Sequence, residues 1–546
     1  MSASNNKENA SYKWLALAAI VMGTFVAVLN NSLINIALPK LVAVFGSTTD
    51  TIQWVLTGYM LASAVVIPMS GALGDKFGYK RVFVTSLALF TISSTFCGFS
   101  WNDSSMIFFR VVQGLSGGFI MPIGMSIIYT IMPREQIGTA LGLWGISAMV
   151  APAVGPTLSG YVIEYFNWRF LFFMGVPVGV LAVIMSSIIL RETPLKKDLK
   201  FDFPGAILSI IGFASLLLAL SKGQSEGWTS LYIVSLLFVA VSSLTLLVYV
   251  ELTTEQPLIE FRILKNGTFS LSLLIVSFLT MGMFGGIFMM PLYMQNIQGL
   301  SAMQTGLLLM PQSIAMALMM PIGGKLFDKF GVVPLGLIGL TLAGITTFEL
   351  QQLAQDTPHR WIDVLLTIRG LGMGLCMTPL STVGMNAIEK SMVGRASSLS
   401  NLIRQVMGSF AIAILTALMS NRQTFHAVRI SENVQATNDT ANQMMSMLSG
   451  VYAQSGVDSA TSMGGASAIL AGLIQKEAFT RGIADTFMVS ALPILLSIPL
   501  VLFFLKKRKA PDDVVVAKRA PIDKPEGESP QNVSSTAGTS PSPVDG

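Results

Sequence analysis

Pro68-Met-Ser-Gly-Ala-Leu-Gly-Asp-Lys-Phe-Gly78 has a counterpart in the second half of the chain, Pro321-Ile-Gly-Gly-Lys-Leu-Phe-Asp-Lys-Phe-Gly331. The two stretches share the pattern Pro-x-x-Gly-x-x-x-Asp-Lys-Phe-Gly, and each stands between two long apolar runs. A loop repeated at the same place in two apolar halves is typical of membrane transporters built from internal repeats. The repeat therefore predicts two membrane-embedded halves that share one plan.

The composition excludes a large soluble protein. Of the 546 residues, 52% are hydrophobic and only 12% are charged, whereas soluble domains carry about 25% charged residues. The net charge of +5 does not indicate nucleic-acid binding, because the basic residues lie in short loops between apolar runs. Cys97 and Cys376 fall within apolar runs of opposite halves, and no cluster of ligating residues accompanies them. We therefore expect no disulfide, no metal site and no cofactor.

The apolar runs predict an all-α membrane protein with fourteen spans, arranged as six, then two, then six. The predicted spans are 14–37, 52–73, 81–100, 106–131, 138–161, 168–190, 204–221, 230–250, 270–296, 304–325, 332–352, 361–386, 398–420 and 484–505. The predicted organisation is a polar N-terminal stub (1–13), a six-helix bundle (14–200), two extra linker helices (201–255), a second six-helix bundle (256–505) with an external loop (421–482), and a disordered tail (506–546). Short amphipathic helices are expected in the external loop.

The distribution of basic residues predicts the orientation in the bilayer. With the N-terminus in the cytoplasm, the inner loops and termini hold 23 of the 34 Lys and Arg residues and the outer loops hold 8. The remaining three, Arg110, Arg369 and Arg404, fall within spans. This asymmetry indicates a multi-pass protein of the cytoplasmic (inner) membrane with both termini in the cytoplasm.

The loop from Gly71 to Arg81, Gly-Ala-Leu-Gly-Asp-Lys-Phe-Gly-Tyr-Lys-Arg, resembles the loop signature of the major facilitator superfamily, with departures at Lys76 and Tyr79. Glycines allow the backbone to turn and helices to approach closely, and an aspartate can lie at the positive end of a neighbouring helix. The resemblance implies a latch that favours one conformation until it is broken. The candidate latch residues are Gly71, Asp75, Gly78, Lys80, Arg81, Gly324, Asp328 and Gly331.

Arg110-Val-Val-Gln113-Gly114 lies near the start of the fourth span and resembles the Arg-x-x-Gln-Gly signature of the same superfamily, which is associated with proton coupling. An arginine within a span costs about 2.5–3.5 kcal/mol on insertion scales and is by default a functional residue. Arg369 occupies the equivalent place in the second half. The alternative for both is an arginine whose side chain reaches toward the headgroups.

Residues 145–160 resemble the antiporter signature of exporters in this superfamily, with Ser159 in place of a glycine. We expect Gly155 and Pro156 to bend this helix and, with Gly160, to allow close contact between the two halves. The resemblance favours efflux over uptake. The alternative is a kinked helix with a packing role only.

Further stretches, among them Gln53–Tyr59, Trp168–Phe172 and Pro291–Gln295, resemble the 14-span drug:proton antiporter subfamily of multidrug efflux transporters (EmrB/QacA-like). The two extra spans fit that subfamily, and the resemblance covers roughly residues 14–505. It implies proton-coupled export of small amphipathic drugs or metabolites, with the lipid bilayer, protons and cargo as the partners. An adaptor protein docking on residues 421–482 stays open.

One departure concerns coupling. Where the subfamily has a first-helix aspartate, this chain has Asn30, and an amide cannot bind and release a proton. Glu164, near the outer end of the fifth span, is then the best titratable candidate for proton coupling alongside Arg110 and Gln113, since burial would raise the pKa of its carboxyl. Coupling through Asp75 with Arg110 is the other hypothesis.

The same departure weakens a preference for cationic cargo. Neutral polar side chains are instead expected in the substrate cavity, with Tyr129 as a further candidate: Asn30, Asn31, Asn35, Tyr59, Trp144, Tyr293, Gln295 and Gln312. An uncoupled facilitator or a lipid or metabolite permease is the second hypothesis. An enzyme or a sensor is disfavoured because the chain shows no metal cluster, nucleophile–base pair or phosphate loop.

Overall fold

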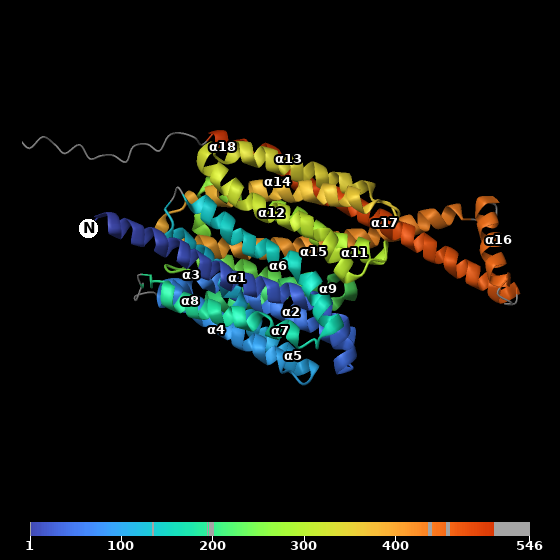
Figure 1. Cartoon of the computed structure of the whole chain (residues 1–546), viewed down its shortest axis with the longest axis horizontal. Helices are drawn as coiled ribbons and strands as arrows, with labels where there is room; N and C mark the ends of the chain where they lie inside the picture. The colour runs from blue at the N-terminus through green and yellow to red at the C-terminus, as the bar shows by residue number, and fades with distance from the viewer. Residues whose placement is uncertain are drawn as a thin grey trace, which may run out of the picture. The chain divides into compact units, whose positions relative to one another are not determined.

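The computed structural model describes residues 2–133, 136–193, 195, 201–434, 439–454 and 459–506, and every regular element in these ranges is a helix (Figure 1). Within the described residues, thirteen helices are long and apolar enough to cross a membrane. The predicted span 138–161 lies in a further helix, Ile137–Tyr165. The predicted all-α membrane architecture is confirmed.

The helices follow the chain as two halves separated by a pair. The first half consists of α1 Ser2–Phe45, α2 Thr49–Val66, η1 Ile67–Met69, α3 Ser70–Phe77, α4 Tyr79–Gly98, α5 Asp103–Ile131, α6 Ile137–Tyr165, α7 Phe170–Phe173 and α8 Gly175–Ile189. The pair consists of α9 Phe203–Glu226 and α10 Leu231–Thr253. The second half consists of η3 Phe261–Lys265, α11 Gly267–Asn296, α12 Ala302–Phe330, α13 Val332–Glu349, η4 Leu350–Gln352, α14 His359–Asn386, η5 Lys390–Met392, α15 Val393–Asn433, α16 Asp439–Gln454, α17 Ser459–Val501 and α18 Phe503–Lys506.

The structure describes the N-terminal end of the chain but not the predicted C-terminal tail. Helix α1 begins at Ser2, so residues 2–13 continue the first span as a helix and do not form a separate stub. The predicted tail lies outside the described residues from position 507 onward.

The repeated loops are shaped by the glycine that ends each copy. Gly78 has φ 94° and Gly331 has φ 80°, a region that a side chain with a Cβ rarely adopts. Each glycine ends a helix by donating its N–H to a carbonyl four residues earlier, Gly74 or Phe327, at 2.9 Å. The next helix begins at once, which explains why both copies require glycine at this position. We call the end of the bundle that carries these loops the motif side.

The two halves meet where α6 packs along α12. A Cβ added to Gly138 would lie 2.6 Å from the carbonyl oxygen of Gly324, and one added to Gly142 would lie 2.5 Å from the Cα of Pro321. Both obstacles are backbone or backbone-bound atoms that cannot move aside. Small residues therefore allow the two helices to touch, as in membrane helix pairs generally.

The predicted role of Gly155 in this contact is wrong. A Cβ at Gly155 would collide with Ser32 of α1, which belongs to the same half, because this turn of α6 faces α1. Ser159 likewise donates to the Leu33 carbonyl of α1 at 2.7 Å. Gly160 does lie against the other half, with its added Cβ 3.5 Å from the Cβ of Met303 in α12. The side chain of Pro156 lies outside the described residues.

The pair α9 and α10 lies beside both halves. Helix α9 packs against α2 of the first half and α15 of the second, and α10 packs against α9. Only 17% of the apolar 18-residue stretch of α10 is buried inside the protein. This fits a helix that faces lipid on most sides.

The predicted external loop 421–482 is largely helical. Helices α15 and α17 extend beyond the bundle with α16 at their end (Figure 1). At the base of this extension Arg422 Nε lies 2.6 Å from Asp485 Oδ2, and His426 Nε2 lies 2.8 Å from the same oxygen. Helix α16, Asp439–Gln454, is a short helix of the expected kind, whereas the flanking residues continue the spanning helices α15 and α17.

We expect Gly142→Ala to destabilise the protein by about 1–3 kcal/mol, because the new methyl group would meet the α12 backbone. The measurement is the thermal unfolding midpoint of the purified protein in detergent. Gly472→Ala is the matched control, since an added Cβ meets nothing within 4 Å there, within helix α17. Equal midpoints for the two variants would contradict the packing described for α6 and α12.

Candidate functional site

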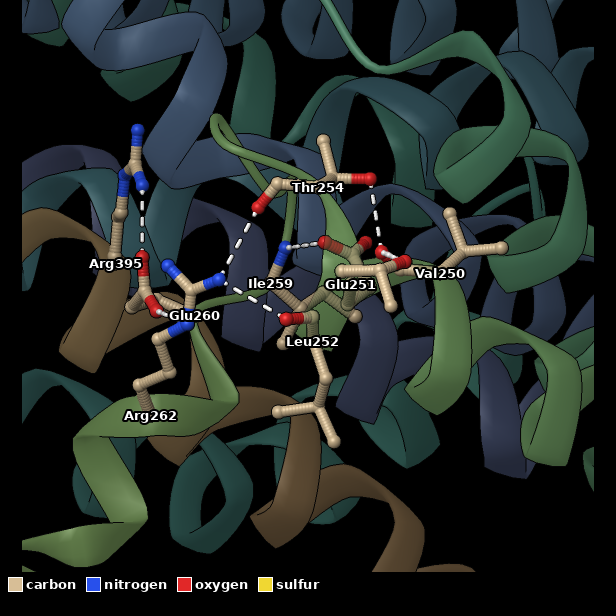
Figure 2. A network of polar contacts seen from close by, with 9 residues as sticks. Val250, Glu251, Leu252, Thr254, Ile259, Glu260, Arg262 and Arg395 are labelled. Atoms are coloured by element: carbon tan, nitrogen blue, oxygen red, sulfur yellow. Dashed lines mark hydrogen bonds and ion pairs between the residues drawn. The ribbon is translucent and has the colours of Figure 1, made fainter.

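The first repeated loop is tied to the second half by charge. Asp75 Oδ2 of α3 lies 3.6 Å from Arg395 Nε of α15. Arg395 Nη1 lies 3.2 Å from Glu260 Oε2, in the segment that joins α10 to η3 (Figure 2). The side chains of Asp75 and Arg395 are only 8% and 12% exposed, so solvent screens their attraction weakly. One arginine thus joins two carboxylates from distant parts of the chain.

Several contacts hold this arginine and its partners in place. The Tyr79 hydroxyl donates to Asp75 Oδ1 at 3.0 Å. An added Cβ at Gly71 would lie 3.0 Å from the Arg395 Cα, so the α3 backbone passes directly over the first turn of α15. On the other side, Arg262 lies 3.9 Å from Glu260 and donates to the carbonyl oxygens of Leu252 and Thr254 (Figure 2). The segment after α10 is thereby fixed beside α15.

The contact continues from the motif side into the bundle through hydroxyl groups of α15. Ser398 donates to the Ile67 carbonyl at 2.6 Å, and Ser397 donates to the Pro122 carbonyl at 2.9 Å. Both acceptors belong to the first half. The Pro122 carbonyl lies inside α5, where it also accepts from the Ser126 hydroxyl at 2.7 Å.

The second copy of the loop meets the first half in the same manner but with different side chains. Gly324 lies against Gly138, the second residue of α6, as Gly71 lies against the start of α15. The residue after Gly394 is Arg395, whereas the residue after Gly138 is Thr139. At this position of the helix start the two crossings therefore differ in side chain.

The basic end of the first loop pairs within its own half. Arg81 Nε lies 3.5 Å from Glu192 Oε2, and the backbone N–H of Lys80 donates to Glu192 Oε1 at 3.2 Å. The Arg81 side chain is 70% exposed, so this pair contributes little to stability. Arg81 therefore shapes the loop and does not connect the halves.

Arg110 is fully buried in the first half and is held by neutral groups. Its Nη1 donates to Asn30 Oδ1 at 2.9 Å and to Gln113 Oε1 at 2.7 Å, and its Nε donates to the Val55 carbonyl at 3.0 Å. The guanidinium carbon lies 4.3 Å from the centre of the Tyr59 ring. Among the described residues Arg110 has no ion pair, and its Nη2 has no hydrogen-bond partner.

Asn30 occupies the place of a counter-ion without carrying a charge. Its Nδ2 donates to Ser94 Oγ at 3.0 Å while its Oδ1 accepts from Arg110. An aspartate could supply the same oxygen but not the donor. The hydrogen bond to Ser94 therefore indicates that this site is built for the amide.

Arg369 repeats the arrangement in the second half. It is 0% exposed, donates from Nε to Thr347 Oγ1 at 2.9 Å and from Nη2 to the Gly282 carbonyl at 2.7 Å, and its Nη1 has no partner among the described residues. Both halves thus bury an arginine on neutral oxygens. The alternative that these arginines reach toward the headgroups does not fit their complete burial.

The structure does not gather the predicted cavity residues into one site. Trp144 donates to Thr24 at 3.0 Å, and the Tyr293 hydroxyl donates to the Ala354 carbonyl at 2.5 Å, so both are engaged by packing neighbours. Gln295 is exposed, whereas Asn31 and Gln312 are partly buried. The side chain of Asn35 lies outside the described residues.

Glu164 lies exposed in the last turn of α6, so the burial assumed for its carboxyl is absent in this structure. Its role in coupling stays a proposal. Asp328 has an interaction partner, and its role in a latch likewise stays a proposal.

Sequence reasoning missed the partners of Asp75. Arg395 and Glu260 each lie near the start or end of a span, where charged residues are common, so neither stands out in the sequence. The one available signal was the Gly394-Arg395 pair at the start of the fifth span of the second half, where the first half has Gly138-Thr139.

We expect Asp75→Asn to loosen the contact between α3 and α15, because Arg395 would lose one of its two carboxylates. With a cysteine introduced by Ser398→Cys, labelling by a membrane-impermeant maleimide from the motif side should be roughly tenfold faster, as a loss of about 1.4 kcal/mol would give. Arg81→Gln is the control, because its pair with Glu192 lies within one half. Equal labelling in all three backgrounds would show that the charges do not hold the halves together.

Comparison with known proteins places this architecture. The family model described as Major Facilitator Superfamily matches residues 20–412. The uncharacterized MFS-type transporter YhcA of Bacillus subtilis is 39% identical, over 79% of this chain and 81% of the relative. The multidrug export protein EmrB of Escherichia coli K12 is 30% identical, over 79% of this chain and 85% of the relative. The solved structure of the proton:xylose symporter XylE superposes with a TM-score of 0.58 at 13% identity, over 91% of this chain and 96% of that one. This chain is therefore a multi-pass membrane transporter that belongs to the Major Facilitator Superfamily.

Proposed function

We propose that this transporter exports small amphipathic drugs or metabolites across the cytoplasmic membrane by alternating access, driven by protons, with both termini in the cytoplasm. The observation that carries the proposal is the closure of the motif side by the Asp75–Arg395–Glu260 contacts between the halves. With the motif side in the cytoplasm, as the basic loops favour, this closure belongs to a state that is sealed toward the cytoplasm.

Two further features support export of this cargo class. The Escherichia coli relative is named a multidrug export protein, and its likeness extends over 79% of this chain. The α6–α12 contact through Gly138 and Gly142 joins the halves without bulky side chains, so that they can rock against each other. An adaptor protein, if one is used, would have to dock on the extension of α15, α16 and α17 (Figure 1).

Coupling to protons requires a group that binds a proton in one state and loses it in another. Arg110 is held by amide and carbonyl oxygens, none of which titrates. The carboxylates of the motif side are better placed, because protonation of Asp75 would weaken its pair with Arg395 and open that side. Glu164 at the opposite end is the second candidate.

An uncoupled facilitator is the alternative, and the bond between Asn30 and Arg110 favours it. In that case the cargo gradient alone drives movement, and the motif-side contacts open by thermal motion. The two functions differ in whether protons cross with the cargo.

The test is proton movement in proteoliposomes that contain the purified protein and an internal pH dye, with amphipathic cargo added outside. Antiport predicts cargo-dependent proton flux that falls at least about tenfold in Arg110→Ala, which removes all the contacts of a buried arginine. Flux lost in Glu164→Gln would assign the carrier to Glu164, and flux lost only in Asp75→Asn would assign it to the motif side. Cargo movement without proton flux would establish the facilitator, and full export by Arg110→Ala would refute a role for Arg110.

Asn30→Asp distinguishes antiport from facilitation by adding a titratable group instead of removing one. The new carboxylate would lie within hydrogen-bond distance of Arg110 and could take up and release a proton. If the natural protein is a facilitator, we expect cargo-dependent proton flux to appear in this variant. Asn31→Asp, one position along the helix and only partly buried, is the control. The measurement is the same pH-dye assay, and no gain in Asn30→Asp would show that this position does not limit coupling.

A further inference from the structure

Arg404 is the third arginine within a span, and its surroundings differ from those of Arg110 and Arg369. It lies on α15 nine residues after Arg395, which places its Cα about 13 Å further along the helix. Because Arg395 lies at the level of the motif-side loop, Arg404 belongs to the hydrocarbon region, which is about 30 Å thick. Its Nε is buried and has no hydrogen-bond partner among the described residues.

Other unpartnered polar groups face the same region. The hydroxyl of Tyr129, on α5 of the first half, lies beside Thr382 of α14 and interacts electrostatically with Arg404. The side-chain oxygens of Tyr129 and Thr382 are buried, and apart from their contact with each other neither has a hydrogen-bond partner in the described part of the chain. Thr378, one helical turn from Thr382 on the same face of α14, is buried and unpartnered in the same way. Tyr129 is 5% exposed, and Thr382 is 0% exposed.

This combination is unusual for a structural site. Buried polar groups in proteins are normally hydrogen-bonded, and a group left without a partner calls for a ligand, an ion or water. Four such groups come from three helices, α5, α14 and α15, and these helices belong to both halves. Arg110 and Arg369 also keep one unpartnered nitrogen each, but the hydrogen bonds that they do donate go to oxygens of their own half.

We propose that Arg404, with the hydroxyls of Tyr129, Thr378 and Thr382, binds the anionic group of an amphipathic cargo, such as a carboxylate, a sulfonate or a phosphate ester. This assignment rests on the proposed transport function, because it names the cargo class of that function. A guanidinium in the hydrocarbon region attracts an anion strongly, and hydroxyl donors complete its coordination. Since helices of both halves supply the groups, rocking of the halves would assemble and dissolve the site.

Apolar side chains lie one helical turn from Arg404, where they would contact the apolar part of the cargo. Gly408, one turn beyond Arg404, lies against the Phe284 ring of α11, whose Cε2 is 2.7 Å from the position of an added Cβ. Phe284 is flanked along α11 by Met283 and Met281. Aromatic and methionine side chains adapt to apolar groups of different shape, which suits a cargo with a fixed charge and a variable body.

The test compares two probes that share one apolar body, anilinonaphthalene sulfonate and its uncharged parent, phenylnaphthylamine. Saturable binding of each is measured by fluorescence with the full-length protein in phosphatidylcholine nanodiscs, and the signal of empty nanodiscs is subtracted. We expect Arg404→Gln to lower the affinity for the sulfonate by about tenfold or more and to leave the uncharged parent unchanged. Arg404→Lys should retain much of the sulfonate affinity, because it keeps the charge. Arg429→Gln is the matched control, since Arg429 is exposed on the same helix.

The outcomes separate this inference from the proposed function. Equal loss of both probes in Arg404→Gln, or no loss of either, would overturn anion recognition. Competition of the sulfonate by phosphatidylglycerol in the nanodisc, abolished in Arg404→Gln, would assign the site to a lipid headgroup and overturn a small-molecule cargo. Arg404-dependent binding without transport in proteoliposomes would sustain the site and refute export, whereas export that is unchanged in Arg404→Gln would refute the site and sustain export.

Discussion

The two halves of this transporter touch where a glycine in one half lies against the backbone of the other. Gly138 meets Gly324, and Gly71 meets the first turn of α15. Backbone contact of this kind lets the helices approach closely, because no side chain stands between them. Each copy of the repeated loop places one glycine at a crossing between the halves. The final glycine of each copy then turns the chain into the next helix. The positions of the charged residues follow from these two crossings.

The crossings are alike in backbone, and they carry threonine and arginine at equivalent positions, Thr139 and Arg395. Only the one between α3 and α15 carries the arginine that joins Asp75 and Glu260. A buried ion pair adds little net stability, but removing one partner is costly. Such a contact is therefore suited to a gate, since it holds firmly while intact and is lost as a unit. Glu260 follows the helix pair α9 and α10 in the sequence. The two extra helices are therefore linked covalently to the Arg395 contact.

Much of the fold could be predicted from the sequence, because apolar length and the repeated loop are local patterns. That Arg110 lies within a span was also predictable, since such an arginine stands out among apolar residues. Its partners were not, because the sequence does not show which helices pack together. The same holds for Trp144, which was predicted to line a cavity: its indole N–H is already satisfied by Thr24 on a neighbouring helix. Polarity within a span indicates a partner, and only packing tells whether that partner is protein or cargo.

The buried arginines define the electrostatics of the translocation path. The acceptors of Arg110 and Arg369 are amide, hydroxyl and carbonyl oxygens, none of which gains or loses a proton. The charge around each arginine is therefore constant. A first-helix carboxylate would cancel the charge of Arg110 when ionised and release it when protonated, whereas Asn30 leaves it constant. A constant positive charge inside each half attracts anions and repels cations. The anion site proposed at Arg404 is consistent with this field, because all three arginines within spans keep one buried nitrogen without a partner among the described residues.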